Sequence, residues 1–186
     1  MTSISRNRRT LMGLEISEEV ITADLRNALA YRSTIRGCSF VNCEIGKADL
    51  SASTIEDCEF IDCDLDQAVF RSASIKRTRF LGGRAQYSSF ENATLSQVKF
   101  DIDLHGADLR YAAAEEVDYS GSNLWGANIR ISCSFFKGMK FDDRSLRLFL
   151  ALLGITKGEP EFVQDVNALS GDQACKMMAK LSEESA

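Results

Sequence analysis

The sequence has little of what most enzyme sites require. It holds a single histidine and a single proline, and no apolar stretch reaches the length of a membrane span. One histidine without a suitably spaced partner leaves no nucleophile–base pair, no metal-ligand spacing and no phosphate-binding loop. We therefore expect a non-catalytic protein without a cofactor, a metal site or a membrane segment.

The net charge and the first residues indicate which partners and which cellular location to expect. The formal net charge is −5, so the chain is mildly acidic and direct binding to nucleic acid is not favoured. The first residues, MTSISRNRR, are basic but are not followed by the apolar core of a secretory signal. A cytoplasmic location is expected.

What the sequence does have is a period of twenty residues divided into fives. Each five-residue unit has an apolar centre, and the residue two positions before that centre is small. A fixed period of this kind must be interpreted before any helix or strand is assigned. The clearest column of centres, each twenty residues after the last, is Phe40, Phe60, Phe80 and Phe100.

Three units, ADLSA, ADLRY and GANIR, match A(D/N)LXX, the consensus of the pentapeptide repeat family, which the chain resembles over residues 23–131. The resemblance implies a right-handed quadrilateral β-helix of about five coils, an all-β solenoid with the centre and the small residue pointing inward. None of these inward positions carries Asp, Glu, Lys or Arg. Buried unpaired charge is very unfavourable, so this absence independently supports an enclosed core.

Three segments are predicted. Residues 1–22 form an N-terminal tail and cap, residues 23–131 form the β-helix, and residues 132–186 form a C-terminal α-helical segment that caps the β-helix or mediates dimerisation. Regularity breaks once, where Phe100 and Leu104 are four residues apart instead of five. A one-residue slip reverses the facing of a strand unless it is absorbed locally, so residues 101–106 are expected to form a kink or a small loop.

Four cysteines follow the same period. Cys38 and Cys58 are twenty residues apart, as are Cys43 and Cys63. Stacked strands lie about 4.8 Å apart, which permits a disulfide. Cysteine is also a small buried hydrophobic residue, and in a reducing cytosol we expect inert core thiols. Their redox state is not fixed by the sequence.

Outward positions in the middle of the repeat carry a run of acidic residues followed by a run of basic ones. On the twenty-residue period, acids fall beside bases, and such pairs stabilise neighbouring strands. Two interpretations therefore remain: charge ladders that help set the register, or a partner-binding surface. The candidate acidic residues are Glu56, Asp57, Glu59, Asp62, Asp64 and Asp66.

Two further residues are candidates for partner contact. His105, the only histidine, falls in the irregular 101–106 segment, and is either an ordinary loop residue or part of a recognition point. Trp125, the only tryptophan, is at an outward position. It either contacts a partner or packs against the C-terminal helices.

After residue 140 the apolar spacing becomes helical, with Asp142 or Asp143 as the N-cap and Gly154 as a stop. A β-helix closed by such a helix, here ending in LLGI, resembles the Qnr-type proteins. That resemblance implies a homodimer formed through this helix, although helices folding back on a monomer would cover the same surface. The candidate dimerisation residues are Leu146, Phe149, Leu150, Leu152 and Leu153.

The resemblance also implies a function. Qnr-type proteins mimic DNA and bind DNA gyrase or topoisomerase IV, so the candidate function is a quinolone-resistance-like protein that binds a type II topoisomerase. The alternatives are a scaffold, adaptor or bacterial effector that binds another protein, and a purely structural rod. The sequence does not identify the partner.

Overall fold

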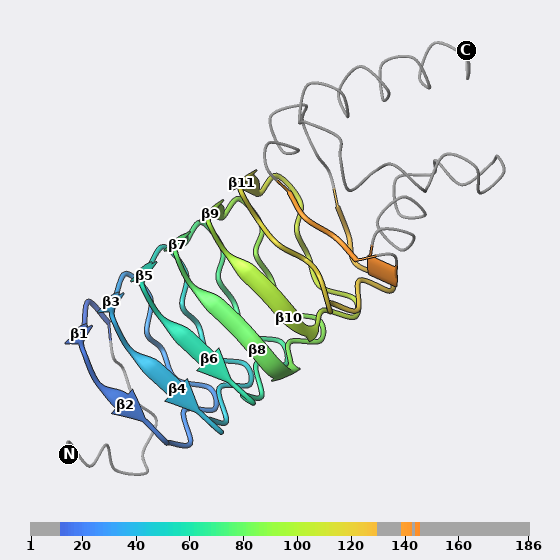
Figure 1. Cartoon of the computed structure of the whole chain (residues 1–186). Coiled ribbons are helices and arrows are strands. Elements are labelled where there is room, and N and C mark those ends of the chain that lie inside the picture. Colours follow the sequence, from blue (N-terminus) through green and yellow to red (C-terminus); the bar gives the residue numbers. More distant parts are fainter. Residues whose placement is uncertain (1–11, 130–138, 143, 146–186) are drawn as a thin grey trace, which may run out of the picture.

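The computed structural model describes residues 12–129, 139–142, 144 and 145, and these residues form an all-β solenoid of about five coils (Figure 1). The predicted fold class is therefore confirmed. The strands are β1 (Glu15–Ser17), β2 (Val20–Ile21), β3 (Thr34–Arg36), β4 (Ser39–Val41), β5 (Thr54–Glu56), β6 (Glu59–Ile61), β7 (Ser74–Lys76), β8 (Arg79–Arg84), β9 (Thr94–Ser96), β10 (Lys99–Asp103) and β11 (Ala113–Glu115).

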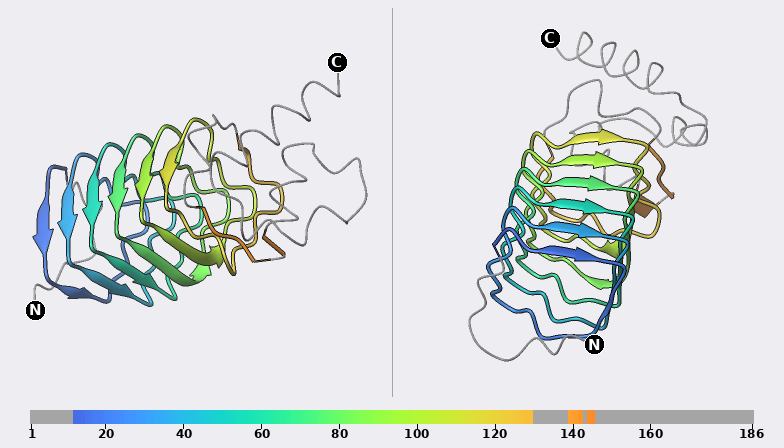
Figure 2. Two further views of the ribbon diagram at one scale, coloured as in Figure 1. Left: turned by 45° about the horizontal axis from the view of Figure 1, so that its top comes forward. Right: turned by 90° about the vertical axis from the view of Figure 1, so that its left-hand side faces the viewer.

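The strands form two parallel sheets on adjoining sides of the rod (Figure 2). Side one is the sheet β1-β3-β5-β7-β9-β11, and side two is the sheet β2-β4-β6-β8-β10. Isolated parallel bridges, such as Glu44 with Asp64 and Asp49 with Val69, link the coils on the other two sides. Side three comprises residues 23–27, 43–47, 63–67, 83–87, 102–106 and 122–126, and side four comprises the five residues that follow each of these segments, as far as residue 129.

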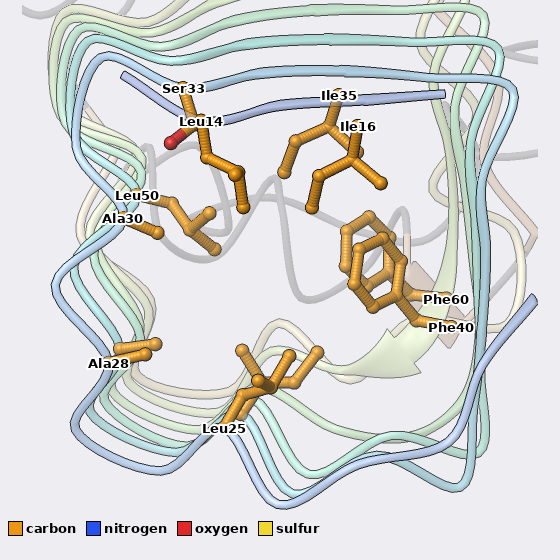
Figure 3. A pocket seen from close by; sticks show the side chains of 12 residues that line it. Leu14, Ile16, Leu25, Ala28, Ala30, Ser33, Ile35, Phe40, Leu50 and Phe60 are labelled. Carbon is orange, nitrogen blue, oxygen red and sulfur yellow. The ribbon is translucent and has the colours of Figure 1, made fainter. Parts of the chain in front are cut away.

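The four sides follow one another clockwise in Figure 3, while later coils lie further from the viewer. This arrangement makes the solenoid right-handed, as the family resemblance implied. Parallel strands joined by crossover connections have this hand in almost all proteins.

The corners explain the five-residue unit. The residue two positions after most of the apolar centres takes a left-handed backbone conformation, for example Asn27 (φ 58°), Asp57 (φ 55°) and Tyr87 (φ 56°). This single turn residue redirects the chain to the next side, so the following centre again points inward. Left-handed conformations are uncommon for residues other than glycine, and their recurrence marks them as part of the fold.

Stacked aromatic rings fill the core on side two. Phe60 lies 4.6 Å from Phe40 and 4.8 Å from Phe80, measured between ring centroids, and the rings are nearly parallel. A second column on side four, which includes Phe70 and Phe90, meets the first edge to face. Offset stacked and edge-to-face pairs are the favoured aromatic arrangements, so each added coil extends the same core.

The regular pentads were expected to start at residue 23, but the two sheets begin earlier, with β1 and β2. Ile16 in β1 pairs with Ile35, and Ile21 in β2 pairs with Phe40, each at nineteen residues. The segment predicted as a cap thus supplies the first strands of the solenoid. Behind them lies an apolar pocket at the N-terminal end of the core, lined by residues that include Leu14, Ile16, Leu25 and Phe40 (Figure 3).

The predicted irregularity at 101–106 is a bulge between β8 and β10. The register shifts between Asp101 and Asp103, and Ile102 between them is buried. The missing residue is the left-handed turn residue itself, so Ile102 occupies the inward position directly. The opposing strand, β8, carries Gly82 and Gly83, both with positive φ. Gly83 is exposed, although its pentad position predicts an inward residue.

At the C-terminal end, Phe141 stacks on Tyr119 and extends the aromatic column. The Ser145 amide donates a hydrogen bond to the Asp142 carboxylate at 2.7 Å, and the Asp142 amide donates one to the Ser145 hydroxyl. This reciprocal pattern is typical of a helix N-terminus and agrees with Asp142 as the N-cap. The five candidate dimerisation leucine and phenylalanine residues lie outside the described residues. Within the described part, no helix is long and apolar enough to cross a membrane.

Candidate functional site: an aromatic corner on side three

The candidate acidic residues do not form one patch. The coil separates them by side: Glu56 and Asp57 belong to side one, Glu59 and Asp62 to side two, and Asp64 and Asp66 to side three. Residues that are adjacent in the sequence therefore face three different directions.

Most of these acids form ion pairs with a base on the next coil. The Asp57 carboxylate accepts two hydrogen bonds from Arg77, at 2.6 and 2.8 Å. The predicted stacking partners are all in contact, which supports the ladder interpretation for this part of the rod. The five pairs are Glu56 with Lys76, Asp57 with Arg77, Glu59 with Arg79, Asp64 with Arg84, and Arg71 with Glu91.

Further along side three, aromatic side chains occur on three successive coils. Tyr87 is the turn residue of its coil, and His105 and Trp125 occupy the position just after the apolar centre on the next two coils. The Tyr87 hydroxyl and His105 Nε2 are 3.1 Å apart, and their rings meet edge to face with centroids 5.3 Å apart. We call Tyr87, His105 and Trp125 the aromatic corner.

Gly106 gives the Tyr87 ring room, and a second glycine, Gly126, lies near His105 at an ordinary contact distance. A Cβ on Gly106 would lie 2.6 Å from the Tyr87 ring, and Gly106 has φ 66°. A Cβ on Gly126 would lie 3.8 Å from His105 Cε1. The Gly106 amide also donates a hydrogen bond to the Trp125 carbonyl, at 2.9 Å, which holds these two coils in register. The backbone therefore fixes the positions from which the rings project.

The aromatic corner is open to solvent. The side chains of Tyr87 and Trp125 are exposed, at 58% and 64% of their full areas, while His105 is half-buried. Large apolar side chains with this much exposure are few on the described surface. Exposed aromatic groups held on a rigid scaffold are typical of contact sites, because tyrosine and tryptophan often dominate binding energy.

On each of these three coils, a polar residue precedes the aromatic residue by one or two positions in the chain. The Asp103 carboxylate accepts hydrogen bonds from the Gln86 amide group at 2.6 Å, from the Asn123 amide group at 2.9 Å and from the His105 backbone N–H at 3.0 Å. The Gln86 backbone N–H donates to Asp66 at 2.9 Å. Gln86 thereby links a carboxylate on the coil before it with one on the coil after it.

The Arg84 guanidinium is shared between Asp64 and Asp66. Its hydrogen bond lowers the pKa of the Asp64 carboxyl. Burial raises the pKa of Asp66, and the negative charges of Asp64 and Asp103 raise it further. Burial alone would raise the pKa of Asp103, but its hydrogen bonds outweigh burial and its pKa is lowered.

Two other kinds of chemical site are metal centres and reactive cysteines. In the described residues, no group of three or more His, Cys, Asp or Glu side chains is placed to hold a metal ion. The four core cysteines are free and buried, and burial raises the pKa of the Cys58 thiol to about 11. The hydrogen bond with Cys63 instead lowers the pKa of the Cys43 thiol to about 7. At the aromatic corner the described groups are exposed rings and hydrogen-bonded carboxylates.

Sequence reasoning identified His105 and Trp125 separately but missed Tyr87 and its contact with His105. Tyr87 and His105 are eighteen residues apart, so neither the twenty-residue period nor its multiples would pair them. The sequence signal was the residue omitted between Phe100 and Leu104. This omission shifts the register by one residue, so that His105 takes the position just after an apolar centre. That shift alone was insufficient, because it does not show where the Tyr87 ring points.

The comparisons with known proteins agree with this architecture. The family model described as "Pentapeptide repeat region" matches residues 33–109 and 53–147. No curated protein matches the chain. Among solved structures, the chain is similar to HetL, a pentapeptide repeat protein involved in heterocyst differentiation regulation in the cyanobacterium Nostoc sp. strain PCC 7120. The identity is 22%, the match covers 73% of each chain, and the TM-score is 0.40.

A trypsin-treated variant of QnrB1, a plasmid-mediated fluoroquinolone resistance protein, is also similar. The identity is 15%, the match covers 83% of this chain and 96% of the other, and the TM-score is 0.35. A pentapeptide repeat protein from the thylakoid lumen of Arabidopsis thaliana has 17% identity over 84% of this chain and 88% of the other, with a TM-score of 0.26.

Proposed function

The chain belongs to the pentapeptide repeat family, and on that premise we propose that it acts by binding another protein and not by catalysis. Its binding surface is the aromatic corner of side three. The single observation that carries the proposal is the exposure of Tyr87 and Trp125 on the two coils that flank His105, with Tyr87 in contact with His105. Repeat solenoids offer extended surfaces that suit partner binding.

Energetic reasoning supports this choice of surface. Burying apolar area yields about 25 cal/mol per Å², and an aromatic side chain offers 150–250 Å². On sides one and two, by contrast, the exposed groups are largely occupied with each other in ion pairs between coils. A partner at the aromatic corner gains contact area without first breaking those pairs.

The finer candidate is a DNA mimic that binds DNA gyrase or topoisomerase IV. One observation favours it: residues 101–129 hold six acidic residues and one arginine. DNA presents about one negative charge per 1.7 Å of its axis. The ladders of the middle coils neutralise the acids there, so any mimicry would be confined to the last coils. We therefore rank DNA mimicry toward a topoisomerase second, after binding of a protein partner through the aromatic corner.

The test uses three matched variants of the full chain. Tyr87→Ala and Trp125→Ala remove the exposed rings, and Tyr111→Ala removes an equally exposed turn tyrosine on side four. A specific partner captured from the source cells by wild type and Tyr111→Ala, but lost from the other two, is expected. Equal capture by all four proteins would overturn the aromatic corner as the binding surface.

The topoisomerase candidate has its own assay. DNA supercoiling by gyrase is measured with and without the protein, in the presence and absence of a quinolone. A DNA mimic should change the extent of supercoiling at micromolar concentration, and Asp118→Asn together with Asp101→Asn should weaken that change. Supercoiling that is unaffected by the wild-type protein would remove the topoisomerase as the partner.

A further inference from the structure

The surroundings of the aromatic corner identify the chemistry of its partner. This inference rests on the proposed function, since it concerns the same surface. The rings supply exposed π faces, and the carboxylates beside them determine which kind of group those faces attract. Charge balance on side three is the deciding quantity.

Three carboxylates, those of Asp64, Asp66 and Asp103, lie along this part of side three, and one guanidinium forms ion pairs with two of them. Arg84 forms ion pairs with Asp64 and Asp66 and is directed toward the earlier coil. Asp103, on the following coil, is bound by neutral donors only: two amide groups and a backbone N–H. The part of side three that bears the aromatic rings therefore keeps the uncompensated negative charge of Asp103.

The donors around Asp103 hold it in place without cancelling its charge. A carboxylate fixed by several hydrogen bonds is ready to accept a cation without reorganisation. Aromatic faces attract cations through their quadrupole, and tryptophan does so best. Tyr87 and Trp125 lie on the coils on either side of Asp103, so one cationic side chain can meet a ring and a carboxylate together.

We propose that the aromatic corner binds an arginine- or lysine-bearing segment of a protein partner, with the cation between the exposed rings and the Asp103 carboxylate. Arginine fits best, because its planar guanidinium stacks on a ring and pairs with a carboxylate in the same plane. A neutral aromatic or sugar ligand would use the rings but would leave Asp103 unused. The partner class follows from that one uncompensated carboxylate.

Trp125 is the only tryptophan in the chain, so tryptophan emission, excited at a wavelength that tyrosine does not absorb, reports on this surface alone. The full chain is titrated with a nona-arginine peptide, with a nona-glutamate peptide and with maltoheptaose. A saturable change in Trp125 emission with nona-arginine only is expected, and it should weaken markedly in high salt. A change with maltoheptaose alone would assign the surface to carbohydrate and overturn the proposal.

Binding is then measured by anisotropy of a labelled nona-arginine peptide, which does not depend on Trp125. Asp103→Asn keeps the size of the side chain and should weaken binding about fivefold, as should Trp125→Ala. Asp49→Asn removes an acid on side four and should leave the affinity within about twofold of wild type. Equal losses in Asp103→Asn and Asp49→Asn would mean that net charge alone attracts the peptide, which would overturn the proposal.

The two proposals fail in different ways. Absence of nona-arginine binding, with partner capture still dependent on Tyr87 and Trp125, would reject the cationic partner and leave the proposed function intact. Absence of both would reject the surface altogether. Circular dichroism and thermal unfolding of each variant exclude misfolding as the cause of any loss.

Discussion

Arg77 donates two hydrogen bonds to the carboxylate of Asp57, one coil earlier, at 2.6 and 2.8 Å. The two residues are twenty positions apart and occupy the same turn position of successive coils, where both have positive φ. This two-bond geometry ties one coil to the next on the outside of the rod. It lowers the pKa of Asp57 and raises that of Arg77.

A double-mutant cycle tests this pair. Asp57→Lys places two positive charges together and should lower the melting temperature by about 2 °C, because exposed ion pairs contribute little. Adding Arg77→Glu restores opposite charges and should recover most of that loss. Asp62→Lys, at the same turn position one side further on, is the control for the change of residue. Strict additivity of the two changes would show that the side chains do not interact.

Replacing Phe60 with alanine removes one ring from the aromatic column. Phe60 is fully buried between Phe40 and Phe80. The expected loss in the free energy of unfolding is about 3–5 kcal/mol, measured by urea titration. Phe60→Leu retains most of the volume and should lose less. A melting temperature for Phe60→Ala within about 2 °C of wild type would contradict the assigned core.

Tyr119→Phe should stabilise the protein. The Tyr119 hydroxyl is buried and has no hydrogen-bond partner among the described residues, and burial raises its pKa. An unpaired buried hydroxyl costs about 1–3 kcal/mol, and phenylalanine fills the equivalent position on earlier coils. We expect a gain of about 1 kcal/mol in urea unfolding. Tyr111→Phe, at an exposed site, is the control, and a loss of stability in Tyr119→Phe would reveal a partner for the hydroxyl.

Gly83→Ala should be poorly tolerated. The added Cβ would lie 2.2 Å from the Cys63 carbonyl oxygen, and Gly83 has φ 73°. Backbone must therefore move, at an expected cost of about 2–3 kcal/mol in unfolding free energy. Gly46→Ala is the matched control, because its nearest atom would be at 3.4 Å and its φ is not positive. Similar stability of the two variants would argue against the β8–β10 bulge geometry.

Stability should fall in acid, and Asp64 should contribute to the fall. Its hydrogen bond with Arg84 lowers its pKa in the folded state. Its stabilising effect is therefore complete above the unfolded pKa of about 3.9 and is lost as the pH falls through the lower folded value. Asp64→Asn should cost about 1 kcal/mol at neutral pH and flatten the decline between about pH 5 and pH 2.

Urea titrations at stepped pH measure this decline, and Asp62→Asn is the control because the structure gives it no base within ion-pair distance among the described residues. An unchanged pH slope in Asp64→Asn would show that the Arg84 contact does not persist in solution.

Much of this protein could be predicted from the sequence because a pentapeptide coil is built from local rules. Each apolar centre and each small residue before it points inward, so the column of Phe40, Phe60, Phe80 and Phe100 and the stacked ion pairs follow from a period of twenty. The same period indicated that Asp57 and Arg77 are neighbours. No long-range information was needed, since every coil contacts only the coils beside it.

Tertiary structure decided what the period could not express. It distributed Glu56, Glu59 and Asp64 over three sides, because each corner turns the chain away from the previous side. It also brought Tyr87 against His105: the turn residue omitted before Leu104 places His105 just after an apolar centre, one coil beyond the left-handed turn at Tyr87. A repeat fixes which residues stack, whereas the break before Leu104 determined which residues lie beside Tyr87 on the next coil.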